Sequence, residues 1–344
     1  MPLLLLYGLL FASATDSWWT VQSAGVEANL RGIAAVVHRT GTVLWATGSK
    51  GTILRSADAG HSWIPIEIEG AGSLDFRGVQ TFDGKVVYVM SSGEGQQSRI
   101  YRSGDGGETW KMQYTDKRKG FFLDALACSD GNHCFALSDP VEGKFLLLAT
   151  SDGEHWTELP RDHMPAALPD EGSFAASNSG LLLYGKNEIY FATGGAAARV
   201  FHSTDLGQTW TASRTPVLSG KASQGIFSIV RAGETVVVVG GDFAEPEHKD
   251  KVAAFSADAG QTWKLAEELP GGYRSSVDTF DAGFLAVGPN GAETSRDGVH
   301  WTHIGGPSLN AVTFISGKGW AVGPKGLVAQ FVDQTEYSTQ SDPQ

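Results

Sequence analysis

Ser56-Ala57-Asp58-Ala59-Gly60-His61-Ser62-Trp63 is the first of six copies of one short phrase in this chain. Each copy has Ser or Thr two residues before an Asp, a Gly one or two residues after it, and a Trp four or five residues after it. The six pairs are Asp58 and Trp63, Asp105 and Trp110, Asp152 and Trp156, Asp205 and Trp210, Asp258 and Trp263, and Asp297 and Trp301. Successive Asp residues lie 39 to 53 residues apart, a period that predicts stacked sheet units, because each unit buries its apolar face only against the next.

The phrase has a local physical reason. The Asp side chain can accept hydrogen bonds from backbone N–H groups of its own turn, and Gly supplies a backbone conformation that other residues avoid. The Trp that follows offers a large apolar surface, which suits packing between neighbouring sheets. We therefore predict that the six Asp residues fix turns and are not catalytic acids.

The strands before each copy also repeat. There are seven such repeats, one more than the number of phrases. Their openings are residues 30–33, 76–79, 122–125, 173–176, 226–229, 273–276 and 309–312. The last unit stops where its phrase should begin, while residues 18–22 match a strand that follows a phrase. We expect an all-β, seven-bladed β-propeller over residues 15–332, closed by its N-terminal strand, because closure removes exposed strand edges.

Composition agrees with this fold and excludes several functions. The chain of 344 residues has 44 Gly, 10 Trp and 17 Phe, and its net charge of −12 argues against nucleic acid as a partner. The nine His residues never pair at metal-ligand spacing, and no glycine-rich strand-to-helix turn or nucleophile elbow is present. We expect no metal, no cofactor and no catalytic residue.

The two ends and the two cysteines bear on localisation. Residues 1–14 are apolar, uncharged and end in Ala12-Ser13-Ala14, which predicts a signal peptide and export to the periplasm or outside the cell. A buried first strand is the alternative. No other stretch is apolar enough for a transmembrane segment, and residues 333–344 are polar and predict a disordered tail. Cys128 and Cys134 flank a turn-like segment, so they form a disulfide if the protein is exported, or else are two small apolar residues in adjacent strands.

Candidate binding residues lie on the face opposite the phrases, where loops join the second and third strands of each unit. Arg31, Arg77 and Arg274 share one phase of units one, two and six, and Asn310 takes it in unit seven. We expect these four to line an arc near the axis that grips a carboxylate. The alternative is that the arginines pair locally, for example with Asp75. The loops of this face add four further candidates, Asp139, Glu142, Arg199 and Asp242.

The phrase is the Asp-box, or BNR, motif, and the chain resembles the Asp-box β-propellers, which include sialidases, some glucanases, sortilin-type receptors and photosystem II assembly factors. Residues 30–33, 45–48, 51–56 and 319–326 read LRGI, WATG, GTILRS and GWAVGPKG, and they look most like the assembly factors. That resemblance implies a non-catalytic, chaperone-like platform that binds a protein or peptide, such as a membrane-protein precursor, partly through arginines. Insertions such as residues 245–250 depart from the compact pattern.

A glycan-cleaving enzyme is the competing hypothesis. Resemblance to sialidases would make the arginines a clamp for a substrate carboxylate and Tyr273 a nucleophile. The acid and base would come from Asp139, Glu142, Glu171 or Asp242. Against this, the Arg-Ile-Pro signature of sialidases is absent, since residues 30–33 contain no proline.

Overall fold

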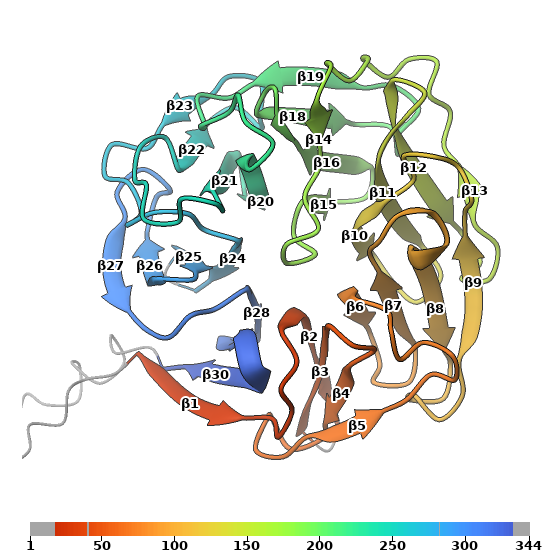
Figure 1. Cartoon of the computed structure of the whole chain (residues 1–344). Coiled ribbons are helices and arrows are strands. Elements are labelled where there is room, and N and C mark those ends of the chain that lie inside the picture. Colours follow the sequence, from red (N-terminus) through yellow and green to blue (C-terminus); the bar gives the residue numbers. More distant parts are fainter. Residues whose placement is uncertain (1–17, 40, 282, 333–344) are drawn as a thin grey trace, which may run out of the picture.

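The computed structural model describes residues 18–39, 41–281 and 283–332. In these residues the chain forms seven antiparallel sheets arranged as a ring around a central axis (Figure 1). The predicted all-β, seven-bladed propeller is confirmed. The predicted signal peptide, residues 1–14, and the predicted polar tail, residues 333–344, lie outside the described residues.

The first three blades are regular four-stranded sheets. Blade 1 contains β2 (Leu30–His38), β3 (Gly41–Gly48), β4 (Ile53–Ser56) and β5 (Ile64–Ile66). Blade 2 contains β6 (Phe76–Thr81), β7 (Val87–Ser91), β8 (Arg99–Ser103) and β9 (Lys111–Thr115). Blade 3 contains β10 (Leu123–Cys128), β11 (Cys134–Val141), β12 (Lys144–Thr150) and β13 (Thr157–Glu158). In each blade the first strand is innermost, and the Asp box joins the third strand to the fourth.

The next three blades follow the same plan, with additions around blades 4 and 5. Blade 4 contains β15 (Leu181–Tyr184), β16 (Glu188–Ala192), β18 (Arg199–Ser203) and β19 (Thr211–Arg214). Blade 5 contains β20 (Gln224–Ala232), β21 (Thr235–Asp242), β22 (Ala253–Ser256) and β23 (Lys264–Leu265). Two short strands, β14 (Glu171–Gly172) and β17 (Gly194–Gly195), extend the sheet of blade 5. Blade 6 contains β24 (Ser276–Phe280), β25 (Gly283–Gly288), β26 (Gly291–Ser295) and β27 (Thr302–Gly305).

Blade 7 is assembled from both ends of the described chain. It contains β28 (Ala311–Ile315), β29 (Lys318–Val322), β30 (Leu327–Phe331) and, as its outer strand, β1 (Trp19–Ser23). β1 and β30 pair antiparallel, with Trp19 opposite Phe331. The rings of Trp18 and Trp19 both pack on Phe331, with centroids 5.7 and 5.4 Å away. The first and last described strands therefore close the ring.

Helical structure is sparse. Besides strands, the described residues form two short 3-10 turns, η1 (Gly95–Gln97) and η2 (Pro324–Gly326). No helix in this part of the chain has both the length and the apolar character that crossing a membrane requires.

The apolar core lies between neighbouring blades. Trp110 of the second box meets Trp45 of blade 1 edge-on at 6.2 Å, and Trp156 of the third box meets Tyr88 of blade 2 in the same way at 6.3 Å. Each of these box tryptophans thus packs against the blade that precedes its own. Aromatic side chains of this size dominate the energy of such interfaces.

Blade 4 departs from the other blades at its inner edge. Residues 173–179, which we call the axial segment, contain no strand and reach toward the centre of the ring just before β15 (Figure 1). Their hydrogen bonds go to four other blades, at Arg77, Leu126, Ser228 and Ser275. The Ser177 hydroxyl donates to the Ser275 carbonyl at 2.6 Å, for example. The axial segment therefore joins blades on opposite sides of the ring, for example blades 2 and 6, as well as the neighbours of blade 4.

Candidate functional site

A β-bulge at the start of an inner strand decides which side chains stand at the inner end of several blades. The register shifts at Arg31 in blade 1, Arg77 in blade 2, Asp124 in blade 3 and Phe227 in blade 5. A bulge inserts one extra residue and re-aims its side chain. The sequence alignment of the units placed Arg31 and Arg77 at the same position. It missed Asp124, because it began the third unit at Phe122 and so placed Leu123 at the position of the arginines.

Arg274 does not join this arc. Its backbone N–H donates to the Gly240 carbonyl, as the N–H of Leu309 does to Gly288, so Arg274 takes the phase of a buried apolar residue and Ser275 takes the phase of the arginines. The Arg274 side chain is fully buried and bonds both carboxylate oxygens of Glu293. The expectation that it lines the arc is corrected: the unit was counted one residue out.

The sequence does contain a signal that Arg274 is buried, namely an acidic residue at a position that is apolar in another blade. Glu293 lies opposite Ala286 in blade 6, where blade 1 has Leu54 opposite Ala46. Glu293 is 1 % exposed, and hydrogen bonds from Arg274 lower its pKa against the opposing effect of burial. An acid at an apolar position demands a buried cation, and Arg274 meets that demand.

Arg31 and Arg77 differ in their partners. Arg77 forks onto Asp75, with its Nε 2.8 Å from Oδ2, and donates its Nη1 to the Ala175 carbonyl at 3.0 Å. The Nε of Arg31 is buried without a hydrogen-bond partner among the described residues. Burial lowers the pKa of Arg31, and the charge of Arg77 lowers it further. Local pairing, the alternative for these arginines, therefore describes Arg77 with Asp75 and Arg274 with Glu293. Arg31 has no hydrogen-bonded carboxylate in the described residues, and the charge of Asp75 only partly opposes the fall in its pKa.

Asn310 braces the ring rather than facing a ligand. Its side-chain amide donates to Asn29 Oδ1 and to the Leu30 carbonyl, both at 2.7 Å, and so ties blade 7 to blade 1. Three of the four residues expected in the arc therefore have internal partners. Arg31 is the exception.

Asp139 lines a cavity of about 610 Å³ between blades 3 and 4, on the face opposite the boxes. Its Oδ1 accepts a hydrogen bond from the Ser173 N–H at 2.9 Å, and burial raises its pKa to about 6. Nearby Asp124 is 1 % exposed, and its Oδ2 has no partner in the described residues. Burial, followed by the charge of Asp139, raises the pKa of Asp124 well above its ordinary value.

The remaining loop candidates are mostly committed to the fold. Arg199 and Glu171 form a buried ion pair, with Arg199 Nε 2.8 Å from Glu171 Oε1. Asp242 is 1 % exposed and accepts hydrogen bonds from Gln224 and from the backbone of its own loop. Glu142 is exposed, and its nearest described cation is Arg161 at 3.8 Å.

Tyr273 is poorly suited to act as a nucleophile. Its ring is buried edge-on against Phe227 at 4.7 Å, and burial raises the pKa of its hydroxyl. Burial disfavours the phenolate, which is the reactive form. The aromatic rings beside it, those of Phe174, Phe227 and Phe243, were not expected from sequence, because isolated aromatic residues in loops carry no period.

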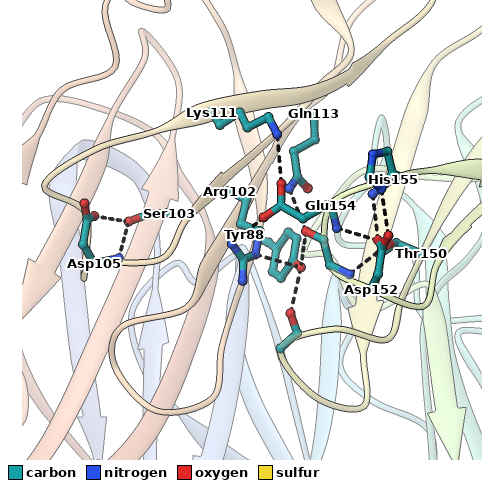
Figure 2. A network of polar contacts seen from close by, with 12 residues as sticks. Tyr88, Arg102, Ser103, Asp105, Lys111, Gln113, Thr150, Asp152, Glu154 and His155 are labelled. Atoms are coloured by element: carbon teal, nitrogen blue, oxygen red, sulfur yellow. Dashed lines mark hydrogen bonds and ion pairs between the residues drawn. The ribbon is translucent and has the colours of Figure 1, made fainter.

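On the opposite face, the Asp side chain of each box is held by internal hydrogen bonds. In the second box Asp105 Oδ1 accepts from the Ser103 hydroxyl at 2.7 Å, and in the third box His155 contacts Asp152 through its Nδ1 (Figure 2). Asp105 Oδ1 also accepts from the Thr109 N–H at 2.9 Å. Boxes 3 and 6 share the His variant, with His300 on Asp297, while the other four use a Ser or Thr hydroxyl. These hydrogen bonds lower the pKa of each box Asp.

Side chains also tie each of three boxes to the preceding blade. Tyr88 donates its hydroxyl to the Gly153 carbonyl at 3.2 Å and contacts Arg102, which with Lys111 pairs with Glu154 (Figure 2). The same tie recurs from Tyr190 to Ala259 and from Trp320 to Ala59. The boxes are therefore built as scaffold.

Cys128 and Cys134 face each other across β10 and β11, and their sulfurs are bonded at 2.06 Å. No group of three or more His, Cys, Asp or Glu side chains in the described residues could hold a metal ion.

Comparisons with known proteins place the fold in context. Residues 13–287 match a family model described as the DUF6242 beta propeller domain. The chain is 23% identical over 304 residues to photosystem II assembly protein Ycf48 of Synechococcus sp. (strain JA-2-3B'a(2-13)), covering 76% of this chain and 84% of that protein.

Two solved structures share the fold. A structure described as YCF48 bound to D1 peptide has a TM-score of 0.64 at 15% identity, covering 92% of this chain and 98% of that one. The GH74 enzyme of Niastella koreensis has a TM-score of 0.61 at 14% identity, covering 90% of this chain and 53% of that one. At these identities the likeness concerns the fold alone.

Proposed function

Because the chain belongs to the DUF6242 β-propeller family, we propose that it is a non-catalytic scaffold that binds an anionic segment of another protein on the face opposite the Asp boxes. Arg31 carries this proposal. A partly buried guanidinium whose Nε has no hydrogen-bond partner in the described residues, beside a second arginine, costs free energy, and a carboxylate from a ligand offsets that cost. Arg77, already oriented by Asp75, supplies a second donor.

Two further parts of the proposal concern the partner and the compartment. A relative named as an assembly protein, and a similar propeller described as bound to a peptide, support a protein segment as the ligand. We propose a membrane-protein precursor as its source. The bonded Cys128 and Cys134 support export to an oxidising compartment, where disulfides persist.

Binding of labelled peptides tests the scaffold proposal. The probes are short fluorescent Gly and Ser peptides with one Glu, and matched peptides with Gln instead. We expect the Glu peptides alone to bind, and Arg31→Glu with Arg77→Glu to weaken binding about thirtyfold or more. Arg296→Glu, an exposed arginine on the box face, is the matched control. Equal binding by wild type and the double variant would contradict the proposal.

A glycoside hydrolase is the second candidate function, favoured by one observation. Asp139 lines a cavity with its pKa raised to about 6, as a general acid requires. The test is a screen of fluorogenic glycosides, including sialosides, with wild type and Asp139→Asn. Turnover that is abolished by the substitution would replace the scaffold proposal.

A further inference from the structure

One exposed aromatic side chain lies on the face opposite the Asp boxes, which we call the binding face. In the described residues the exposed large apolar side chains are Val21, Val37, Ile64, Met112, Leu206 and Phe243. Of these, Phe243 alone is aromatic, and it is 52 % exposed. It lies in the loop between β21 and β22, on the face opposite the boxes, whereas Ile64 and Met112 lie on outer strands.

Phe243 belongs to a cluster of four rings that we call the aromatic patch: Phe174, Phe227, Phe243 and Tyr273. Phe174 of the axial segment stacks on Phe227 at 3.9 Å, and Phe243 meets both rings edge-on at 6.3 and 6.1 Å. Tyr273 closes the cluster against Phe227. The patch is therefore built jointly by the axial segment, the bulge of β20 and two loops.

The loop that carries Phe243 is fixed, although the ring is exposed. The Phe243 N–H donates to the Ser223 carbonyl at 3.2 Å. The preceding residue, Asp242, is buried and accepts from Gln224 Nε2 at 3.0 Å and from the Ala244 N–H at 2.9 Å. A loop whose backbone is already fixed loses little conformational entropy when a ligand covers it.

The aromatic patch adjoins the arginine pair. Arg77 donates to the carbonyl of Ala175, which follows Phe174 in the chain. The charges of Arg31 and Arg77 both oppose the rise that burial causes in the pKa of Tyr273, so both guanidinium groups lie within electrostatic reach of its hydroxyl. One short ligand segment can therefore contact the patch and the arginines together.

We propose that the aromatic patch receives an aromatic side chain of the same segment whose carboxylate Arg31 and Arg77 bind. The inference rests on the proposed function and adds sequence selectivity to it. Charge alone would accept any acidic segment, whereas edge-to-face packing on Phe243 favours an aromatic ring a few residues from the carboxylate.

A peptide scan tests this pairing. Each fluorescent Gly and Ser peptide carries one Glu and a single Phe at a different position, with an Ala counterpart for each. We expect one spacing to bind about tenfold or more tighter with Phe than with Ala. Phe243→Ala should abolish that preference while keeping the Glu dependence, and Met112→Ala, another exposed apolar residue, should leave both unchanged.

The outcomes separate the two proposals. Binding that depends on Glu and on Arg31 without any preference for Phe overturns the aromatic inference and leaves the scaffold proposal intact. A Phe preference that survives Phe243→Ala does the same. Absence of Glu-dependent binding overturns both.

Discussion

The two faces of the ring are made by the same strands but treat polar groups differently. On the box face, the Asp side chains, turn N–H groups and carbonyls satisfy one another in a pattern that repeats in six blades. At the inner end of the other face, Arg31, Asp75 and Asp124 each keep a buried polar atom without a partner in the described residues. The repeated hydrogen bonds of the box face therefore indicate a structural role. The buried polar atoms without partners on the other face indicate where a ligand should be sought.

The largest effect on stability is expected at Arg274. This arginine lies near the face opposite the boxes, but its side chain is as fully hydrogen-bonded within the protein as the Asp of any box. Arg274→Gln leaves Glu293 charged in the core, so we expect a loss of about 3–5 kcal/mol in the free energy of unfolding, measured by denaturant titration. Replacing Arg274 and Glu293 together by Leu, the pair that blade 1 has at Leu30 and Leu54, should restore most of that loss. An unchanged single variant would contradict the assignment.

A fall in pH should change stability in opposite directions through Asp58 on the box face and Asp139 on the opposite face. Hydrogen bonds from Ser62 lower the pKa of Asp58 from 3.8 to about 2, so its stabilisation is present above pH 4 and is lost as pH falls toward 2. Burial raises the pKa of Asp139 to about 6, so its contribution is present below pH 4 and is lost as pH rises through 6.

Thermal melting from pH 2 to 7 measures both effects. Asp139→Asn should lessen the decline in melting temperature between pH 4 and 6, and Asp58→Asn should lessen the decline below pH 4, to which the other five box Asp residues also contribute. If a variant leaves the pH dependence of melting in its own pH range unchanged, the pKa shift assigned to that Asp is wrong.

A single box hydroxyl should have an intermediate effect. Ser256 Oγ is buried and accepts the Gly260 N–H at 2.8 Å, so Ser256→Ala leaves that N–H without an acceptor. We expect a loss of about 1–3 kcal/mol in stability and no change in peptide binding. Ser219→Ala, at an exposed serine, is the control. Selective loss of binding by a stable Ser256 variant would break the distinction between the faces.

The smallest effect on stability is expected for Arg31→Gln. Because Arg31 Nε has no partner in the described residues, its removal should lower the free energy of unfolding by no more than about 0.5 kcal/mol, and relief of the uncompensated charge should act in the stabilising direction. The same variant should lose most Glu-dependent peptide binding. A strongly destabilised Arg31 variant would show that the guanidinium serves the fold.

Sequence reasoning reached the fold through local signals. Each box carries its own turn residues, so counting boxes and strand openings sufficed to predict seven blades. Arg274 shows where the same counting fails, because one residue of offset exchanges a buried position for an axial one. The axial segment was beyond prediction, since its hydrogen bonds go to four other blades and leave no period in the chain.

Pairing of β1 with β30 also sets an order of events during synthesis. Trp19 and Phe331 are more than 300 residues apart in the chain, so β1 leaves the ribosome first and finds its partner last. Until β30 arrives, β29 lacks its outer neighbour, and β1 has no strand to pair with. Contacts between such distant residues form slowly and leave edges open to wrong partners. The emergence of β30, and not the completion of any earlier blade, therefore decides when the ring can close and its strand edges are protected from aggregation.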